Sequence, residues 1–187
     1  MHREEDCRMQ TFVPSIPLQN ISNFAQTKAQ TLLDLNKDPI DTPIKDIVMS
    51  LNALPYCYTI QCCWGHFVST SQPDKHNLAV VKKKDIDEKI EYRIAYLALS
   101  LENTPAGKAF LDKMEKIPTI INSSYVQFGC AQWFLQRHVN SYVLQVQPSD
   151  RAHVDSMTVL REEALLIQST RNVFWDTIRQ FVKKITG

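Results

Sequence analysis

Three cysteines and a histidine, groups that can bind metals or act as nucleophiles, fall within ten consecutive positions: Cys57, Cys62, Cys63 and His66. Thiolate and imidazole groups are ligands for zinc and iron, so the cluster supports a metal-binding hypothesis. Its spacing differs from that of structural zinc sites, which usually present two separated pairs of ligands. If the segment is a strand, Cys62 and Cys63 point to opposite faces. We therefore expect no metal here, and thiols that behave as small buried side chains.

A cysteine nucleophile is an alternative use of the same residues. Cys63 with His66 or His138 would make the thiolate–imidazole pair that covalent catalysis uses. The spacing alone does not bring these side chains together, so buried thiols remain the favoured interpretation. Gly65 adds a third use, because a glycine at the end of a strand lets a ligand approach the backbone closely.

The composition argues against several classes of function. The 187-residue chain has a formal net charge of +1, so it has no overall attraction for nucleic acids, and we expect no DNA binding. The polar stretch 1–10 lacks the apolar core of a signal peptide, and the longest apolar run, 95–101, is too short to span a membrane. Five cysteines, an odd number, fit a reducing compartment, so we expect a cytoplasmic protein without membrane contact. Four glycines cannot supply a glycine-rich phosphate loop.

The elements that must position the cluster follow from apolar spacing and from start signals. Residues 1–16 are expected to form a flexible N-terminal arm, and apolar residues at helical spacing predict a helix over 21–33. The Thr-Pro pair at 42–43 marks the start of a second helix. The aromatic and cysteine-rich stretch 56–64, bounded by a proline and a glycine, predicts the strand that carries the cluster.

Later in the chain, helices and strands are expected in separate blocks. Apolar spacing predicts a helical segment over 85–117, between strands. Residues 132–147 are expected to form two strands joined by a turn, followed by helices that begin at Ser149 and near Ser169. Such blocks predict a single α+β domain over 1–187, with a mixed, largely antiparallel sheet and helices packed on it.

Aromatic side chains offer surfaces on which a nucleobase could stack. Trp133 and Trp175 are open candidates, whereas Phe174 falls on the core-facing stripe of its predicted helix. His138 lies near the expected hairpin turn, so we expect it on the surface.

Three short sequences carry a resemblance to a known family: Asp34-Leu-Asn-Lys-Asp-Pro-Ile-Asp-Thr-Pro-Ile, Ser50-Leu-Asn-Ala-Leu-Pro and Tyr58-Thr-Ile-Gln-Cys-Cys-Trp-Gly-His-Phe. They resemble the wybutosine-synthesis tRNA methyltransferase family, in which a helix precedes the motif Tyr-Thr-Thr-Ser-Ser-Cys-Ser-Gly-Arg. The residues that match this motif are Tyr58, Thr59, Cys63 and Gly65, and those that differ are Ile60, Gln61, Cys62, Trp64 and His66. Further on, Tyr142-Val-Leu-Gln-Val resembles the family's last strand, with Gln145 in place of its histidine.

The resemblance implies the family's fold and its chemistry. That chemistry is methyl transfer from the cofactor S-adenosylmethionine to a modified guanosine base, and the partner is tRNA. It also implies which residues would bind the substrate or cofactor: Thr59, Cys62, Cys63, Gly65 and His66. In this interpretation Gly65 allows close backbone approach, while Thr59 and His66 donate hydrogen bonds. The resemblance assigns no catalytic residue.

Two other functions stay open, because serines and an arginine of the family motif are replaced in this chain. One is a non-catalytic RNA-binding, nucleotide-binding or interaction protein that kept the fold. The other is a metal- or thiol-dependent protein that uses Cys57, Cys62, Cys63 and His66. Binding of S-adenosylmethionine would separate the first from an active methyltransferase, and metal analysis would identify the second.

Overall fold

The computed structural model describes residues 12–35, 37, 39–69, 74, 76–78, 88–151 and 154–186. Its helices and short 3-10 turns are α1 (Phe24–Leu35), η1 (Thr42–Ile44), α2 (Lys45–Ala53), α3 (Pro105–Met114), α4 (Ile117–Ile121), α5 (Gln132–Leu135), η3 (Ser149–Arg151) and α6 (Arg161–Thr186). Its strands are β1 (Phe12–Val13), β2 (Cys57–Cys63), β3 (His66–Val68), β4 (Lys89–Arg93), β5 (Ala95–Leu101), β6 (Val126–Ala131), β7 (Ser141–Val146) and β8 (Ser156–Leu160). The chain is an α+β protein, which confirms the predicted fold class.

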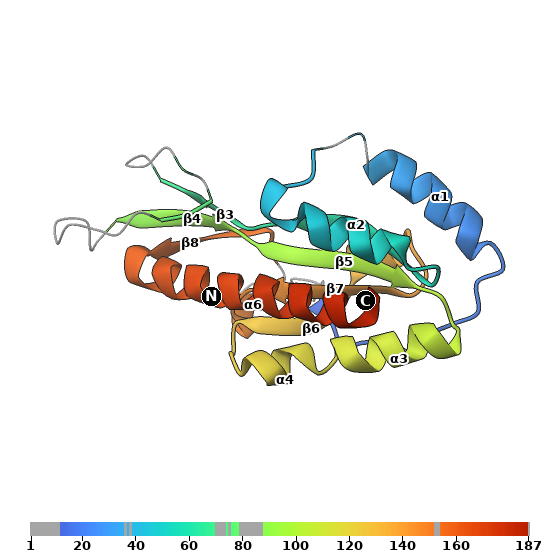
Figure 1. Ribbon diagram of the computed structural model, residues 1–187. Helices are drawn as coiled ribbons and strands as arrows, with labels where there is room; N and C mark the ends of the chain where they lie inside the picture. Colours follow the sequence, from blue (N-terminus) through green and yellow to red (C-terminus); the bar gives the residue numbers. More distant parts are fainter. Residues whose placement is uncertain are drawn as a thin grey trace, which may run out of the picture.

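The strands form two antiparallel sheets in the described part of the chain. A five-stranded sheet has the order β1-β6-β7-β5-β2, and a three-stranded sheet has the order β3-β4-β8. β4 and β5 follow one another almost directly and link the two sheets, as Figure 1 shows. β2 is an edge strand of the larger sheet. The residues of the predicted site therefore lie at the border of that sheet.

The long helix α6 covers one face of the sheets, flanked by α2 and α4 (Figure 1). Its apolar residues recur every three or four positions, so they form one stripe that faces the strands. Buried residues of this main core include Ile47, Leu51, Leu97, Leu99, Leu144, Val146, Phe174, Trp175, Ile178 and Val182. Burying one such side chain contributes about 1.5–3 kcal/mol to the free energy of unfolding. Because this core contains most of the buried apolar side chains among the described residues, it supplies most of the hydrophobic stabilisation.

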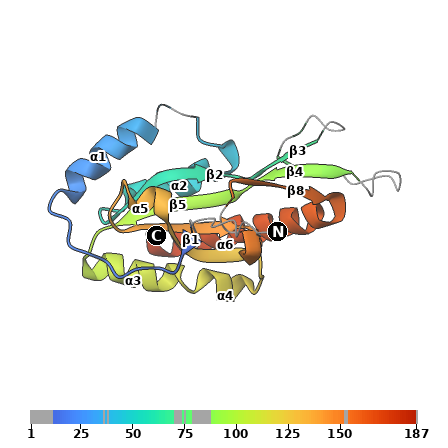
Figure 2. The same ribbon diagram turned by 180° about the vertical axis from the view of Figure 1, so that it is seen from behind.

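The opposite face of the larger sheet has a thinner cover, made by α1 and α5 (Figure 2). A second, small core lies there, with Ala98, Phe134 and Val143 buried and Phe12 packed against them. Short covering elements bury less of a sheet face than a long helix does. This face is where a pocket opens beside β2.

The helix predicted within 85–117 is wrong over its described first part, because residues 89–101 form β4 and β5. The misleading signal was the spacing of Ile86, Ile90 and Ile94. An interval of four residues fits one face of a helix and also one face of a strand, whose period is two. The predicted start at 85–87 lies outside the described residues. The later helix α3 does begin after Thr104, whose side-chain oxygen accepts from the Gly107 amide at 3.1 Å.

Three predictions in the C-terminal half are also wrong. Residues 132–135 form a helical turn rather than a strand, in which Trp133 and Arg137 stack on one another four positions apart. The helix expected to begin at Ser149 is replaced by a 3-10 turn and β8, because Met157 and Val159 alternate with exposed neighbours. The break expected near residue 169 is absent, and α6 runs through it.

The end of the predicted N-terminal arm is a strand. Phe12 and Val13 pair with β6, while residues 1–11 lie outside the described part. Gly129 makes this pairing feasible, since a Cβ there would lie 2.4 Å from the Val13 carbonyl oxygen. Among the described residues, no helix combines the length and the apolar character needed to cross a membrane.

Candidate functional site

Gly65 forms the turn between β2 and β3, and its backbone φ of +94° is one that other residues rarely adopt. A Cβ at this position would lie 2.8 Å from the Ala95 Cβ and 3.1 Å from the Arg171 Cδ. The close approach that was expected toward a ligand is therefore made by the protein itself. Gly65 fixes the direction in which the chain leaves β2 and enters His66.

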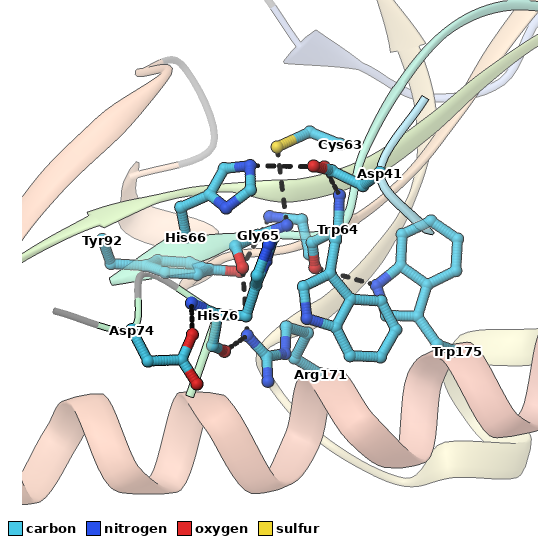
Figure 3. Close-up of polar contacts among 11 residues, drawn as sticks. Asp41, Cys63, Trp64, Gly65, His66, Asp74, His76, Tyr92, Arg171 and Trp175 are labelled. Carbon is cyan, nitrogen blue, oxygen red and sulfur yellow. Dashed lines mark hydrogen bonds and ion pairs between the residues drawn. The ribbon is translucent and has the colours of Figure 1, made fainter. Parts of the chain in front are cut away.

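Arg171 of α6 is fully buried and holds two separate segments of the chain together. Its Nη1 donates to the Gly65 carbonyl at 3.0 Å and to the His76 carbonyl at 2.5 Å. Its Nη2 donates to the Asn77 side-chain oxygen at 3.1 Å, and its guanidinium lies over the Trp64 ring at 4.7 Å (Figure 3). Burial lowers the pKa of Arg171 to about 10, so it stays charged at neutral pH.

Asp41, His66 and His76 gather beside this turn, and we call these three residues the histidine cluster (Figure 3). The His66 Nε2 lies 3.2 Å from the Asp41 Oδ2, and the two imidazole centroids are 5.0 Å apart. The same Asp41 oxygen accepts from the Trp64 amide at 2.9 Å. Both Asp41 and His66 are mostly buried, with side chains 20% and 14% exposed.

The cysteines of the predicted cluster are separated by the structure. Cys57 is fully buried in the main core, and Cys62 lines a pocket on the outer side of β2. Burial raises the pKa of each of these two thiols to about 12, so neither is a thiolate at neutral pH. Cys63 stays near the turn, where its Sγ accepts from the Gly65 amide at 3.4 Å. Regular pairing of β2 with β5 at these positions sends the side chains of Cys62 and Cys63 to opposite faces.

Two other predicted residues serve the core. Thr59 is fully buried, and among the described residues its hydroxyl has no hydrogen-bond partner. It is not among the residues that line the two pockets described below. Trp175 is fully buried as well and stacks on Trp64, with ring centroids 5.9 Å apart. Its indole donates to the Trp64 carbonyl at 3.0 Å (Figure 3). Trp175 therefore offers no face to a nucleobase.

A pocket of about 350 Å³ lies between α1, β2 and α5, and we call it the Trp133 pocket. The lining residues used below are Asp34, Cys62, Trp133, Arg137 and His138. Trp133 is 60% exposed, and the Arg137 guanidinium carbon lies 3.5 Å from the centre of its ring. This pocket thus combines an aromatic plane, a cation and a carboxylate.

A second pocket of about 200 Å³, called the small pocket, shares two residues with the first. Arg137 and His138 line both, while Thr27 and Tyr58 line only the small one. Burial, and then the neighbouring Arg137, lower the pKa of His138, so its imidazole is neutral at neutral pH. Its Nδ1 is buried without a hydrogen-bond partner in the described part of the chain.

The predicted site thus divides between two places. Cys63, Gly65 and His66 belong to the surroundings of the histidine cluster, and Cys62 belongs to the Trp133 pocket. Sequence reasoning did not identify Asp41, His76, Arg137 and Arg171. Asp41 lies inside the first of the three family-like sequences, so the sequence did contain a signal for it. Arg171 lies 106 residues from Gly65, whose carbonyl it contacts, and no local sequence pattern connects the two.

The sequence matches no family model and no curated protein. Among solved structures it is similar to the PH1069 protein from Pyrococcus horikoshii, with 13% identity, a TM-score of 0.47, and coverage of 87% of this chain and 96% of that one. A structure of the PH1069 protein from Pyrococcus horikoshii OT3 gives 16% identity, a TM-score of 0.43, and coverage of 90% and 93%.

Proposed function

We propose that this protein is a divergent relative of the wybutosine-synthesis methyltransferases, which binds S-adenosylmethionine and methylates a modified guanosine base in tRNA. One observation carries the proposal: two pockets share a wall made by Arg137 and His138. A transfer between two molecules needs donor and acceptor side by side, and adjoining pockets supply that proximity. The Trp133 pocket would take the cofactor and the small pocket the base.

The residues of the Trp133 pocket fit S-adenosylmethionine. Its volume of about 350 Å³ lies within the usual range for small-molecule sites. Trp133 offers an aromatic plane for adenine, and the Asp34 carboxylate can accept from ribose hydroxyls. Arg137 can pair with the carboxylate of the methionine part. When bound, the cofactor supplies an electrophilic methyl group.

The small pocket would receive a base that has left its stack. Its volume of about 200 Å³ suits a nucleobase better than a nucleotide with its phosphates. Modifying proteins reach their target atom by extruding the nucleotide, or by acting in single-stranded loops. Tyr58 supplies an aromatic edge beside the base, since its ring lies 6.3 Å from that of His138.

His138 is the residue that would take the proton released from the base. A neutral imidazole accepts a proton, and burial keeps His138 neutral. Its place in both pockets puts it next to donor and acceptor alike. The acceptor nitrogen would lose its proton to His138 as the new carbon–nitrogen bond forms, while the methyl–sulfur bond of the sulfonium breaks and a neutral thioether leaves.

Calorimetric titration with S-adenosylmethionine is the first test. We expect micromolar binding, about −8 kcal/mol. Trp133→Ala should weaken it at least about fivefold, because stacking on one aromatic ring contributes about 1–3 kcal/mol. Ile120→Ala is the matched control, since Ile120 is a similarly exposed apolar residue on α4, far from both pockets. If the wild type does not bind S-adenosylmethionine, the proposed methyltransferase function is wrong.

Methyl transfer itself is tested with phenylalanine tRNA that carries the unmethylated tricyclic base and a tritiated methyl donor. His138→Asn should keep cofactor binding but lower turnover by about 100-fold, the usual contribution of a positioned proton acceptor. Binding of the tRNA and of S-adenosylmethionine without turnover by the wild type would favour the non-catalytic RNA-binding alternative.

A further inference from the structure

The histidine cluster has the composition of a metal site that the methyltransferase proposal does not use. Two imidazoles and one carboxylate form the ligand set of many mononuclear iron(II) centres, and zinc accepts the same donors. Asp41, His66 and His76 each offer one ligand atom, and these atoms all lie within 4.8 Å of one another. We propose that the histidine cluster binds one divalent transition-metal ion of the zinc or iron(II) class.

The distances are close to those of a bound shell. With metal–ligand bonds of about 2.0–2.2 Å, neighbouring ligand atoms lie about 3.0–3.5 Å apart. The Asp41 Oδ2 and the His66 Nε2 already meet this condition at 3.2 Å. His76 supplies the third ligand atom, which lies within 4.8 Å of the other two. Its Nδ1 is buried and lacks a hydrogen-bond partner among the described residues, so binding would satisfy a polar atom that the fold leaves unsatisfied.

The backbone around each ligand is held in place before any ion binds. Asp41 accepts from the Trp64 amide at 2.9 Å. His66 begins β3 and is paired with Arg93 of β4. His76 is fixed from both sides, since its amide donates to the Asp74 side chain at 2.8 Å and its carbonyl accepts from Arg171 (Figure 3). Such outer contacts orient the ligands and raise metal affinity.

The local charges are balanced for a cation. The buried guanidinium of Arg171 opposes a positive ion, whereas Asp41 in the cluster and Asp74 beside it carry negative charges. Three protein ligands leave coordination positions open, which is the arrangement of metal sites that bind water or a small ligand rather than of structural sites. Among the described residues, the three ligands found within reach of one another include no cysteine, so the proposed site uses no thiol from this part of the chain.

The test uses the untagged full chain, stripped with a chelator and titrated with Co²⁺, then with Zn²⁺ in competition. We expect one equivalent of Co²⁺ to bind, with visible absorption bands and without the intense near-ultraviolet band of a cobalt–thiolate bond. His66→Gln and His76→Gln should each weaken binding about 100-fold. His138→Gln, the matched histidine substitution outside the cluster, should bind as tightly as the wild type.

Several results would overturn the proposal. They are absence of stoichiometric Co²⁺ and Zn²⁺ binding, an equal loss of affinity in His138→Gln, and a thiolate absorption band that disappears in Cys63→Ser. Melting temperatures of the metal-free variants show whether each is folded. Should His66→Gln unfold, His76→Gln still decides, since His76 lies in a segment outside the strands. Calorimetry with S-adenosylmethionine is a separate experiment, so either proposal can fail alone.

Discussion

The histidine cluster lies beside the turn that follows β2, and the Trp133 pocket is lined in part by β2, yet the two are built in opposite ways. Gly65 and Arg171, which shape the first, are buried, and Arg171 holds backbone carbonyls from two distant segments. The second depends on Trp133, which is 60% exposed, and on Arg137 stacked upon it. The histidine cluster is fixed by buried contacts of the fold, whereas the Trp133 pocket depends on side chains exposed to solvent.

This contrast predicts how each region responds to substitution. Substitutions of the residues that support the histidine cluster should lower the free energy of unfolding, because they leave buried backbone groups without partners or force the turn open. Changes in the Trp133 pocket should cost ligand binding and leave the free energy of unfolding nearly unchanged. A substitution that violates this division would show that the two sites are less distinct than their burial indicates.

Arg171→Met should have the largest effect. It leaves the Gly65 and His76 carbonyl oxygens without their donor in a region that excludes water, and each such loss costs about 1–3 kcal/mol. We expect the free energy of unfolding, measured in urea, to fall by about 3–5 kcal/mol. Arg179→Met on the same helix is the control, because its ion-pair partners Asp46 and Asp176 are exposed and it donates to only one backbone carbonyl, that of Pro43, so it should cost about 1 kcal/mol. Equal losses of unfolding free energy in the two variants would contradict the view that Arg171 holds the two chain segments together.

Gly65→Ala should come next, with a loss of about 2–4 kcal/mol. The added Cβ would lie 2.8 Å from the Ala95 Cβ, and the φ of +94° strains any residue with a side chain. The double variant Gly65→Ala, Ala95→Gly removes the contact but keeps the strain, so it should recover only part of the stability. Urea unfolding of the wild type and both variants checks this order, and a Gly65→Ala protein as stable as the wild type would refute it.

Local signals in the sequence predicted part of the fold. The strand that carries the cysteines was found because a proline and a glycine bound it, and α3 was found from its Thr104 cap. The stretch 89–101 was missed because an apolar residue every four positions fits a strand as well as a helix. Only pairing with β2, β7 and β8 decides between them, and that pairing depends on distant parts of the chain.

The candidate site shows the same limit. Cys63, Gly65 and His66 were predicted together because they are neighbours in sequence, and they do remain together. Arg171 was invisible, since an arginine in an amphipathic helix usually faces water. Trp133 was an open candidate for stacking on a nucleobase, but the strand predicted around it would not have placed Arg137 on its ring. The residues that join distant segments were the ones that the sequence could not show.

Trp133→Ala tests the other side of the comparison. Because the ring is 60% exposed, removing it should change the free energy of unfolding by about 1 kcal/mol at most, mainly through loss of the Arg137 contact. Trp175→Ala is the matched substitution in the core, and it should cost about 3–5 kcal/mol. Thermal and urea unfolding of both proteins measure this difference. A large loss of stability in Trp133→Ala would mean that the pocket is part of the core.

The smallest expected effect is a pH dependence that originates at His138. Burial, helped by Arg137, lowers the pKa of His138 in the folded protein, so between that value and the ordinary value near 6.5 the unfolded chain binds the extra proton. The stabilisation is therefore fully present above about pH 6.5 and is lost as the pH falls toward the lowered pKa. His138→Asn removes this titration, so its unfolding free energy should change less with pH between about 5 and 7 than that of the wild type. Urea unfolding at several pH values gives both slopes. Because His138 is only partly buried, the difference should be small, and parallel slopes would mean that His138 is as solvated in the folded chain as in the unfolded one.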